Sequence, residues 1–110
     1  MDGRARLKFT RRPLPFIVDA VNSLEATLEI KNRLGLHLRA ASTLADTVKR
    51  FSATVTLTKG KQTINARSVT NLIMLGAGPG SKLKVKVEGP DAPAAMAAIK
   101  DLFEQRFNED

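Results

Sequence analysis

The sequence predicts an α+β domain in which a layer of helices covers one face of a β-sheet. Three segments, residues 24–31, 53–58 and 82–88, alternate apolar and polar side chains with a period of two. That pattern is typical of strands with one buried and one solvated face. Segments with apolar residues at helical spacing lie between and after them, so the expected order is strand, helix, strand, strand, helix, strand, helix, in two layers.

The first expected strand, residues 24–31, ends at the loop 32–35, and a helix follows. Phe51 is expected to close the end of this helix against the core. The helix's apolar stripe consists of Leu38, Ala41, Leu44, Ala45 and Val48.

A β-hairpin and a short helix come next. The strand 53–58 is followed by the turn Lys59-Gly60, and residues 61–66 return as its partner. Ser68 then opens a short apolar segment that Gly76 closes, and serine before and glycine after a segment are typical helix caps.

The last strand and helix complete the order. The strand 82–88 presents a stripe of lysines, Lys82, Lys84 and Lys86, which we interpret as its solvated face. Asp91 is the expected N-cap of the final helix, with Pro93 in its first turn. The buried stripe of that helix is Ala95, Met96, Ile99, Leu102 and Phe103, and we assign these side chains to the core.

Composition limits the classes of protein to consider. A chain of 110 residues suffices for one domain with a core, and it has no cysteine for disulfide or thiolate chemistry. No apolar run approaches the ~20 residues that a membrane-spanning helix needs. We therefore expect a cytoplasmic protein without membrane insertion. With one histidine and no paired carboxylates or nucleotide-binding loop, no metal, no cofactor and no turnover enzyme are expected.

The net charge of +7 is divided unevenly along the chain. Residues 1–22 hold 5 basic and 2 acidic side chains (+3), and residues 23–110 hold 13 and 9 (+4). We interpret 1–22 as a basic, flexible extension and 23–110 as the domain. All 5 aromatic residues are Phe, which leaves little for bases to stack on, so no specific nucleic-acid partner is expected. An acidic protein partner suits the charge equally well.

The loop before the first helix contains the one histidine, His37. It falls at or beside the helix N-terminus, where unpaired N–H groups and the helix dipole favour an anion such as phosphate. A neutral imidazole is a competent nucleophile there. Arg39 adds a guanidinium that fits phosphate oxygens, and Gly35 permits a positive φ and a close backbone approach. A simple capping or packing histidine explains the same position, so the local pattern alone leaves both interpretations open.

Two motifs resemble a known family. Residues 32–42, with His37 and Arg39, resemble the active-site loop of HPr, the histidine-containing phosphocarrier of the bacterial sugar phosphotransferase system. Residues 68–76 resemble the second signature of that family, a serine that opens a short helix closed by Leu-Gly. Together with 82–89 and 91–107, which match the family's last strand and helix, the resemblance covers roughly residues 23–107.

The resemblance implies a fold and a set of roles. The fold is an open-faced β-sandwich of four antiparallel strands covered on one face by three helices. His37 would be phosphorylated on Nδ1 by a phosphoenolpyruvate-dependent upstream phosphotransferase and would pass the group to an acceptor or permease component. Arg39 would neutralise the phosphate, and a regulatory serine kinase would act on Ser68. The partner-docking patch would be Val69, Thr70 and Ile73, on a monomer.

Three features depart from the family's usual pattern. Ala40 stands where proline is usual, Leu38 is bulkier than the usual small residue, and residues 1–22 are an addition. They leave room for a second hypothesis, a regulatory module with the same fold that acts by contact and is switched by phosphorylation of His37 or Ser68. The third, a basic nucleic-acid-binding domain, has only the net charge in its favour.

Overall fold

The computed structural model describes residues 23–109, and the predicted extension 1–22 lies outside them. Four strands form one sheet, and every neighbouring pair is antiparallel, in the order β2-β5-β3-β4. Their bounds are Ser23–Glu29 for β2, Thr54–Lys59 for β3, Gln62–Asn65 for β4 and Lys82–Glu88 for β5.

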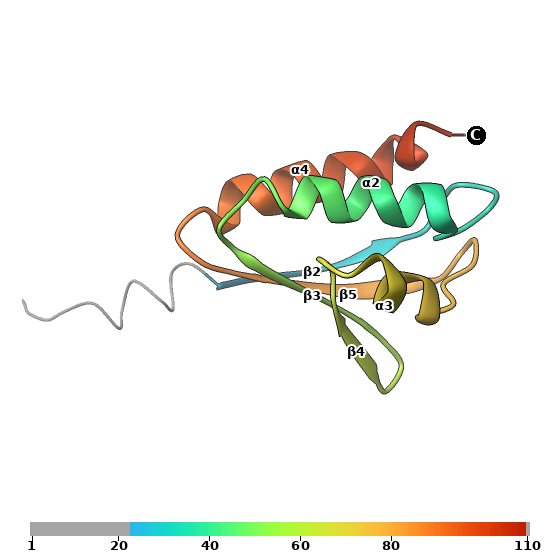
Figure 1. Ribbon diagram of the computed structural model, residues 1–110, viewed down its shortest axis with the longest axis horizontal. Coiled ribbons are helices and arrows are strands. Elements are labelled where there is room, and N and C mark those ends of the chain that lie inside the picture. The colour runs from blue at the N-terminus through green and yellow to red at the C-terminus, as the bar shows by residue number, and fades with distance from the viewer. Residues whose placement is uncertain (1–22, 110) are drawn as a thin grey trace, which may run out of the picture.

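Helices α2 (Leu38–Val48) and α4 (Ala92–Glu104) lie over one face of this sheet (Figure 1), and a third helix, α3 (Val69–Met74), packs against α2 and β4. A short 3-10 turn, η1 (Arg106–Asn108), follows α4. Helix α2 packs against both other helices, α4 against β2 and β5, and α3 against β4. The predicted fold class, an open-faced sandwich of four antiparallel strands and three helices, is confirmed.

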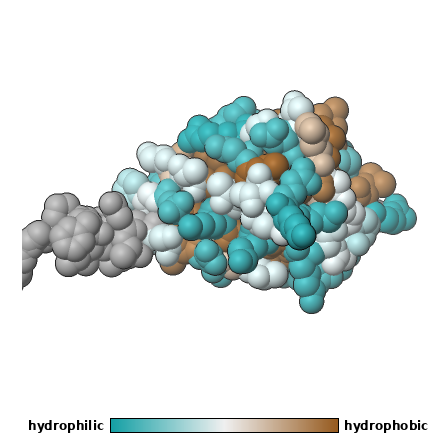
Figure 2. Space-filling model, turned by 90° about the horizontal axis from the view of Figure 1, so that it is seen from below, coloured by the Kyte–Doolittle hydropathy of each residue, from teal (hydrophilic) through white to brown (hydrophobic). Residues whose placement is uncertain are grey.

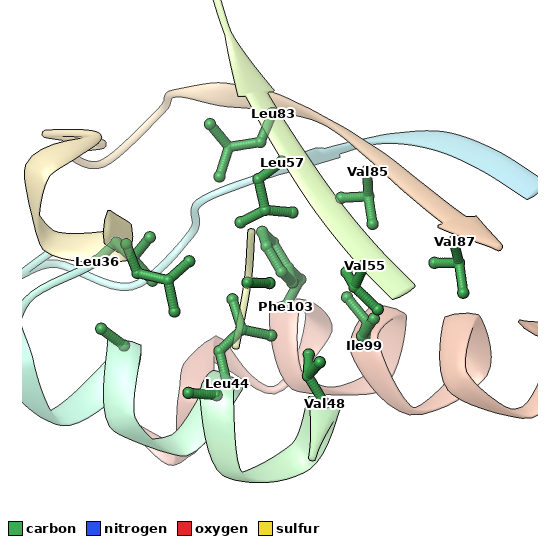
Figure 3. Close-up of a cluster of buried hydrophobic side chains, with 14 of the residues drawn as sticks. Leu36, Leu44, Val48, Val55, Leu57, Leu83, Val85, Val87, Ile99 and Phe103 are labelled. Carbon is green, nitrogen blue, oxygen red and sulfur yellow. The ribbon is translucent and has the colours of Figure 1, made fainter. Parts of the chain in front are cut away.

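The core lies between the two layers, where the buried face of the central strands meets α2 and α4 (Figure 3). Each fully buried aliphatic or aromatic side chain stabilises the fold by about 1.5–3 kcal/mol relative to an exposed one. The side chains that form this contact are Val55, Leu57, Leu83, Val85 and Val87 from the strands and Leu44, Val48, Ile99 and Phe103 from the helices.

The opposite face of the sheet is polar, as the alternation predicted. Figure 2 shows it from below, mostly hydrophilic in colour. Acidic residues of β2 lie opposite lysines of β5, Glu25 across from Lys86 and Glu29 across from Lys82. Such pairs of opposite charge favour this register. Among the helices of residues 23–109, none has the length and hydropathy that crossing a membrane would require.

Two predicted details of the helices were wrong. Leu38 belongs to no buried stripe, because it is 63% exposed at the first position of α2, while Ala40 is fully buried in the first turn. The final helix ends at Glu104, short of the residue 107 that the resemblance suggested, because Arg106, Phe107 and Asn108 adopt left-handed backbone conformations.

Asp91 occupies the predicted N-cap position of α4 but makes no side-chain bond to that helix. Its carboxylate instead accepts the backbone N–H groups of Ser52 at 2.8 Å and Ala53 at 2.9 Å. The residue therefore ties the start of α4 to the segment that enters β3, across 38 positions of sequence.

We predict that Asp91→Ala lowers the free energy of unfolding by about 1–3 kcal/mol, since it removes an ionised acceptor from two backbone donors. Chemical denaturation followed by circular dichroism measures the loss. The control is Asp46→Ala, which removes an exposed carboxylate of α2 and should change stability by less than about 0.5 kcal/mol. If the free energy of unfolding fell equally in the two variants, the bonds from Asp91 to Ser52 and Ala53 would contribute no specific stability.

Candidate functional site

The loop between β2 and α2 is held against the segment that follows α3. The N–H of Leu36 donates to the carbonyl of Ala77 at 2.8 Å. Gly35 makes this approach possible: its φ is +68°, and a Cβ there would lie 2.7 Å from the same carbonyl oxygen. The positive φ predicted for Gly35 is confirmed, and the close approach that the structure shows is to this carbonyl. The loop therefore holds the chain that leads to His37 against the segment after α3.

His37 is the N-cap of α2, as predicted. Its backbone is extended, with φ −79° and ψ −179°, and its Nδ1 accepts the N–H of Arg39 at 3.3 Å. The carbonyl of His37 accepts the first helical bond, from Ala41 at 2.8 Å. Nδ1 therefore lies at the N-terminus of α2, the positive end of the helix dipole, and the side chain is 28% exposed.

The other ring nitrogen meets a carboxylate that sequence reasoning missed. Nε2 of His37 lies 2.6 Å from Oε2 of Glu109. The second carboxylate oxygen accepts from Nδ2 of Asn32 at 2.9 Å, and the same amide nitrogen donates to the carbonyl of Gly35 at 2.7 Å. Asn32 is fully buried and Glu109 only 14% exposed, so these bonds are sheltered from water.

The turn after α4 places Glu109. Three consecutive non-glycine residues, Arg106, Phe107 and Asn108, have φ values of 57°, 54° and 62°. A left-handed conformation costs roughly 1–2 kcal/mol for each such residue. Phe107 offsets part of this cost, because it is buried and its ring packs 5.0 Å from that of Phe103. The turn also closes on itself, since the N–H of Glu109 donates to the carbonyl of Arg106 at 2.9 Å.

An open pocket of about 270 Å³ lies beside the histidine. Its lining combines two guanidinium-bearing residues, Arg33 and Arg39, with the carboxylate-bearing Glu109. Within residues 23–109, no three histidine, cysteine, aspartate or glutamate side chains gather in a way that could hold a metal ion. The full lining is Arg33, Leu34, Arg39, Asn108 and Glu109.

Helix α3 carries the other residues singled out from the sequence. Ser68 is its N-cap, and its hydroxyl accepts the N–H of Asn71 at 3.2 Å. Thr70 and Ile73 are exposed, whereas Val69 is half-buried and packs against the core. The loop bond at Ala77, directly after this helix, joins α3 to the segment that carries His37.

Large apolar side chains are exposed on α3 and on the segment that carries His37. Met74 on α3 is 67% exposed, and Leu34 and Leu38 on either side of His37 are 67% and 63% exposed. Sequence reasoning gave Met74 and Leu34 no role. Together with Ile73, at 42%, they are the exposed large hydrophobic residues of the described chain.

The pKa of the Glu109 carboxyl lies below its ordinary value of 4.5. The largest cause is the hydrogen bond with His37, followed by the hydrogen bond from Asn32; the positive charge of Arg39 acts in the same direction. Because the folded state binds this proton more weakly than the unfolded state, the contact stabilises the fold above pH 4.5 and is lost as the pH falls through the lowered pKa.

We predict that Glu109→Gln lowers the melting temperature at about pH 7 and that the difference from the wild type shrinks as the pH falls through the lowered pKa of Glu109. The reason is that a protonated glutamate offers nearly the same hydrogen bonds as glutamine. Thermal unfolding of both proteins across this range measures the effect. A difference that stays constant with pH would show that the ionised carboxylate contributes nothing specific.

Comparison with known proteins identifies the family of this chain. A family model described as the PTS HPr component phosphorylation site matches residues 24–105. The phosphocarrier protein HPr of Xylella fastidiosa strain Temecula1 is 43% identical over 88 residues, which cover 79% of this chain and 98% of the relative. The phosphocarrier protein NPr of Shewanella violacea is 39% identical over 89 residues, covering 81% and 98%.

Solved structures agree. HPr-C-His from Thermoanaerobacter tengcongensis superposes with a TM-score of 0.76 at 37% identity, covering 79% of this chain and 98% of that one. HPr from Bacillus anthracis strain Ames gives 0.71 at 27% identity, with coverage of 74% and 96%. The chain therefore belongs to the HPr family, the phosphocarrier proteins of the phosphotransferase system.

Proposed function

We propose that His37 carries a phosphoryl group on Nδ1. A phosphoenolpyruvate-dependent upstream phosphotransferase donates the group, and an acceptor protein, either a sugar permease component or a regulatory target, takes it. One observation carries the proposal: Nδ1 lies at the N-terminus of α2, while Nε2 is occupied by Glu109. Only one ring nitrogen is therefore directed at a site that suits an anion.

The surroundings of Nδ1 suit a phosphoryl group that must later leave. Arg39 contributes its backbone N–H and an exposed guanidinium, and the pocket beside it is lined by charged and polar groups. A partly exposed histidine is reachable by protein partners in turn. Moderate stabilisation by exposed groups keeps the phosphoryl group transferable, because solvent weakens such electrostatic contacts.

Protein partners would dock on the apolar surface beside the histidine. Val69, Thr70 and Ile73 form the proposed patch, and Met74 and Leu38 extend it. Exposed apolar surface next to a charged site is typical of an interaction surface. We place the carrier in the cytoplasm as a monomer, with no specific nucleic-acid partner and no bound cofactor.

Ser68 supports a second candidate function, a regulatory module that acts by contact. As the N-cap of α3 the serine has a structural role already, through its bond to Asn71. Phosphorylation by a serine kinase would add negative charge at the start of α3, next to Val69, and would change docking more than folding. In this case phosphorylation of His37 or Ser68 switches binding, and no phosphoryl group passes on.

For the carrier, we predict that phosphoenolpyruvate and the cognate upstream enzyme label the wild type with an acid-labile phosphate and leave His37→Asn unlabelled. Asparagine is a good N-cap without a nucleophilic ring nitrogen, so this variant keeps the helix and loses only the chemistry. Phosphate-affinity electrophoresis, before and after mild acid, measures the label. Arg39→Ala should slow labelling about tenfold or more, from loss of a charge-assisted hydrogen bond.

A wild type that the cognate enzyme does not label, or a label that survives in His37→Asn, would refute the carrier. If the label forms but no acceptor receives it, and if phosphorylation changes the binding of a partner, the protein acts as the regulatory module.

For the docking patch, we predict that Ile73→Asp weakens phosphotransfer by raising the KM for this protein at least about tenfold, because docking would bury an unpaired charge. Its thermal melting should stay close to that of the wild type, since Ile73 is 42% exposed. Ala97→Asp is the control, with the same charge on an exposed position of α4. Equal KM values for the two variants would remove α3 from the interface.

A further inference from the structure

Both nitrogens of the His37 ring have partners that distinguish them. Nε2 faces Oε2 of Glu109 at 2.6 Å, and Nδ1 faces the backbone N–H of Arg39 at 3.3 Å. A backbone N–H can only donate, so Nδ1 must present a lone pair to it. An ionised carboxylate can only accept, so Nε2 must carry the hydrogen. Each contact alone selects the same tautomer of the neutral ring.

The carboxylate itself is held in place from behind. Asn32 is fully buried, and its Nδ2 donates to Oε1 of Glu109 and to the carbonyl of Gly35. One carboxylate oxygen of Glu109 accepts from Asn32 and the other contacts His37, so the carboxylate cannot rotate without losing one of the two contacts. The backbone of Glu109 is held by the turn that contains Phe107, whose ring is buried against Phe103.

The segments that meet here lie far apart in the chain. Asn32 and His37 precede and open α2, whereas Glu109 follows α4, 72 positions after the histidine. The turn that delivers Glu109 needs three left-handed residues in succession, which unconstrained chains rarely adopt. Strained backbone beside a reactive side chain is a feature of sites in which geometry serves the chemistry.

We propose that Glu109 is a positioning residue for phosphotransfer: held by Asn32, its carboxylate keeps the proton on Nε2 of His37 and so makes Nδ1 the nucleophile. The proposal rests on the proposed function of His37. It also explains why the ring reacts at one nitrogen, because Nε2 is covered by the carboxylate and Nδ1 faces the open end of α2.

The atoms and charges of the step balance without any proton transfer. The lone pair of Nδ1 forms the N–P bond, and the P–O bond of the donor breaks with its electrons on the leaving oxygen. The ring keeps its Nε2 proton and becomes a cation, which the Glu109 carboxylate pairs. When the acceptor attacks phosphorus, the N–P bond breaks, its electrons return to Nδ1, and the original tautomer is restored.

Long-range ¹H–¹⁵N NMR of the wild type, at a pH where the ring is neutral, tests the tautomer directly. The expected result is a single form of His37 with the proton on Nε2. A proton on Nδ1, or a mixture of tautomers, would overturn the proposal without reference to any partner protein or variant.

Phosphotransfer kinetics test the role with Glu109→Gln. We expect the maximal rate of phosphorylation by the upstream enzyme to fall about tenfold, comparable to losing the outer partner of a metal-bound histidine. The KM for this protein should stay unchanged, because the proposed docking patch is intact. In the same variant, NMR should still show the proton on Nε2, because the glutamine oxygen can accept from it and the N–H of Arg39 still faces Nδ1. The rate falls because the variant lacks the negative charge that pairs the phosphorylated ring. Glu104→Gln, at the exposed carboxylate that pairs with Lys31, is the matched control and should behave as the wild type.

The outcomes separate the two hypotheses. A labelled wild type with an equally fast Glu109→Gln variant overturns the role of Glu109 and leaves the carrier intact. A wild type that is not labelled, yet has the proton fixed on Nε2, refutes the carrier and leaves the assigned tautomer of His37 standing.

Discussion

The need to cover one apolar face of a four-stranded sheet determines most of this structure. The central strands β5 and β3 alternate buried and exposed side chains, so a slip of one residue would turn every valine and leucine toward water. The helices α2 and α4 bury that face, and their positions follow from where their own apolar stripes meet it. Since α2 must lie with its buried stripe on the sheet, its N-terminus and His37 come to one end of the sandwich.

Local signals in the sequence predicted the parts of the site that depend on neighbouring residues. His37 and Ser68 were expected as N-caps, and Gly35 as a residue with positive φ, because each signal involves only a few consecutive positions. The alternation of the strands predicted both sheet faces for a similar reason. The exposed side of the first turn of α2 was harder to predict than its N-cap. Leu38 fits the helical spacing but is exposed, whereas Ala40 is buried.

Contacts between distant segments could not be predicted in this way. Glu109 reaches His37 only because the last helix stops at Glu104 and three residues turn left-handed. Of these three, only Asn108 has a local preference for that conformation, which does not predict the whole turn. The role of Asn32 depends on a carboxylate 77 positions away, which the sequence around it does not indicate. Asp91 was expected to cap its own helix, but its carboxylate accepts the backbone N–H groups of Ser52 and Ala53 instead. These contacts arise from packing, which sequence spacing does not encode.

The 72-residue separation between His37 and Glu109 has a consequence for the order in which the protein is made. During synthesis the histidine leaves the ribosome long before the carboxylate that orients it, and β5, which joins the two edges of the sheet, also comes late. A nascent chain would therefore display the reactive ring without its fixed tautomer. The site is complete only after Glu109 has emerged and the left-handed turn before it has formed.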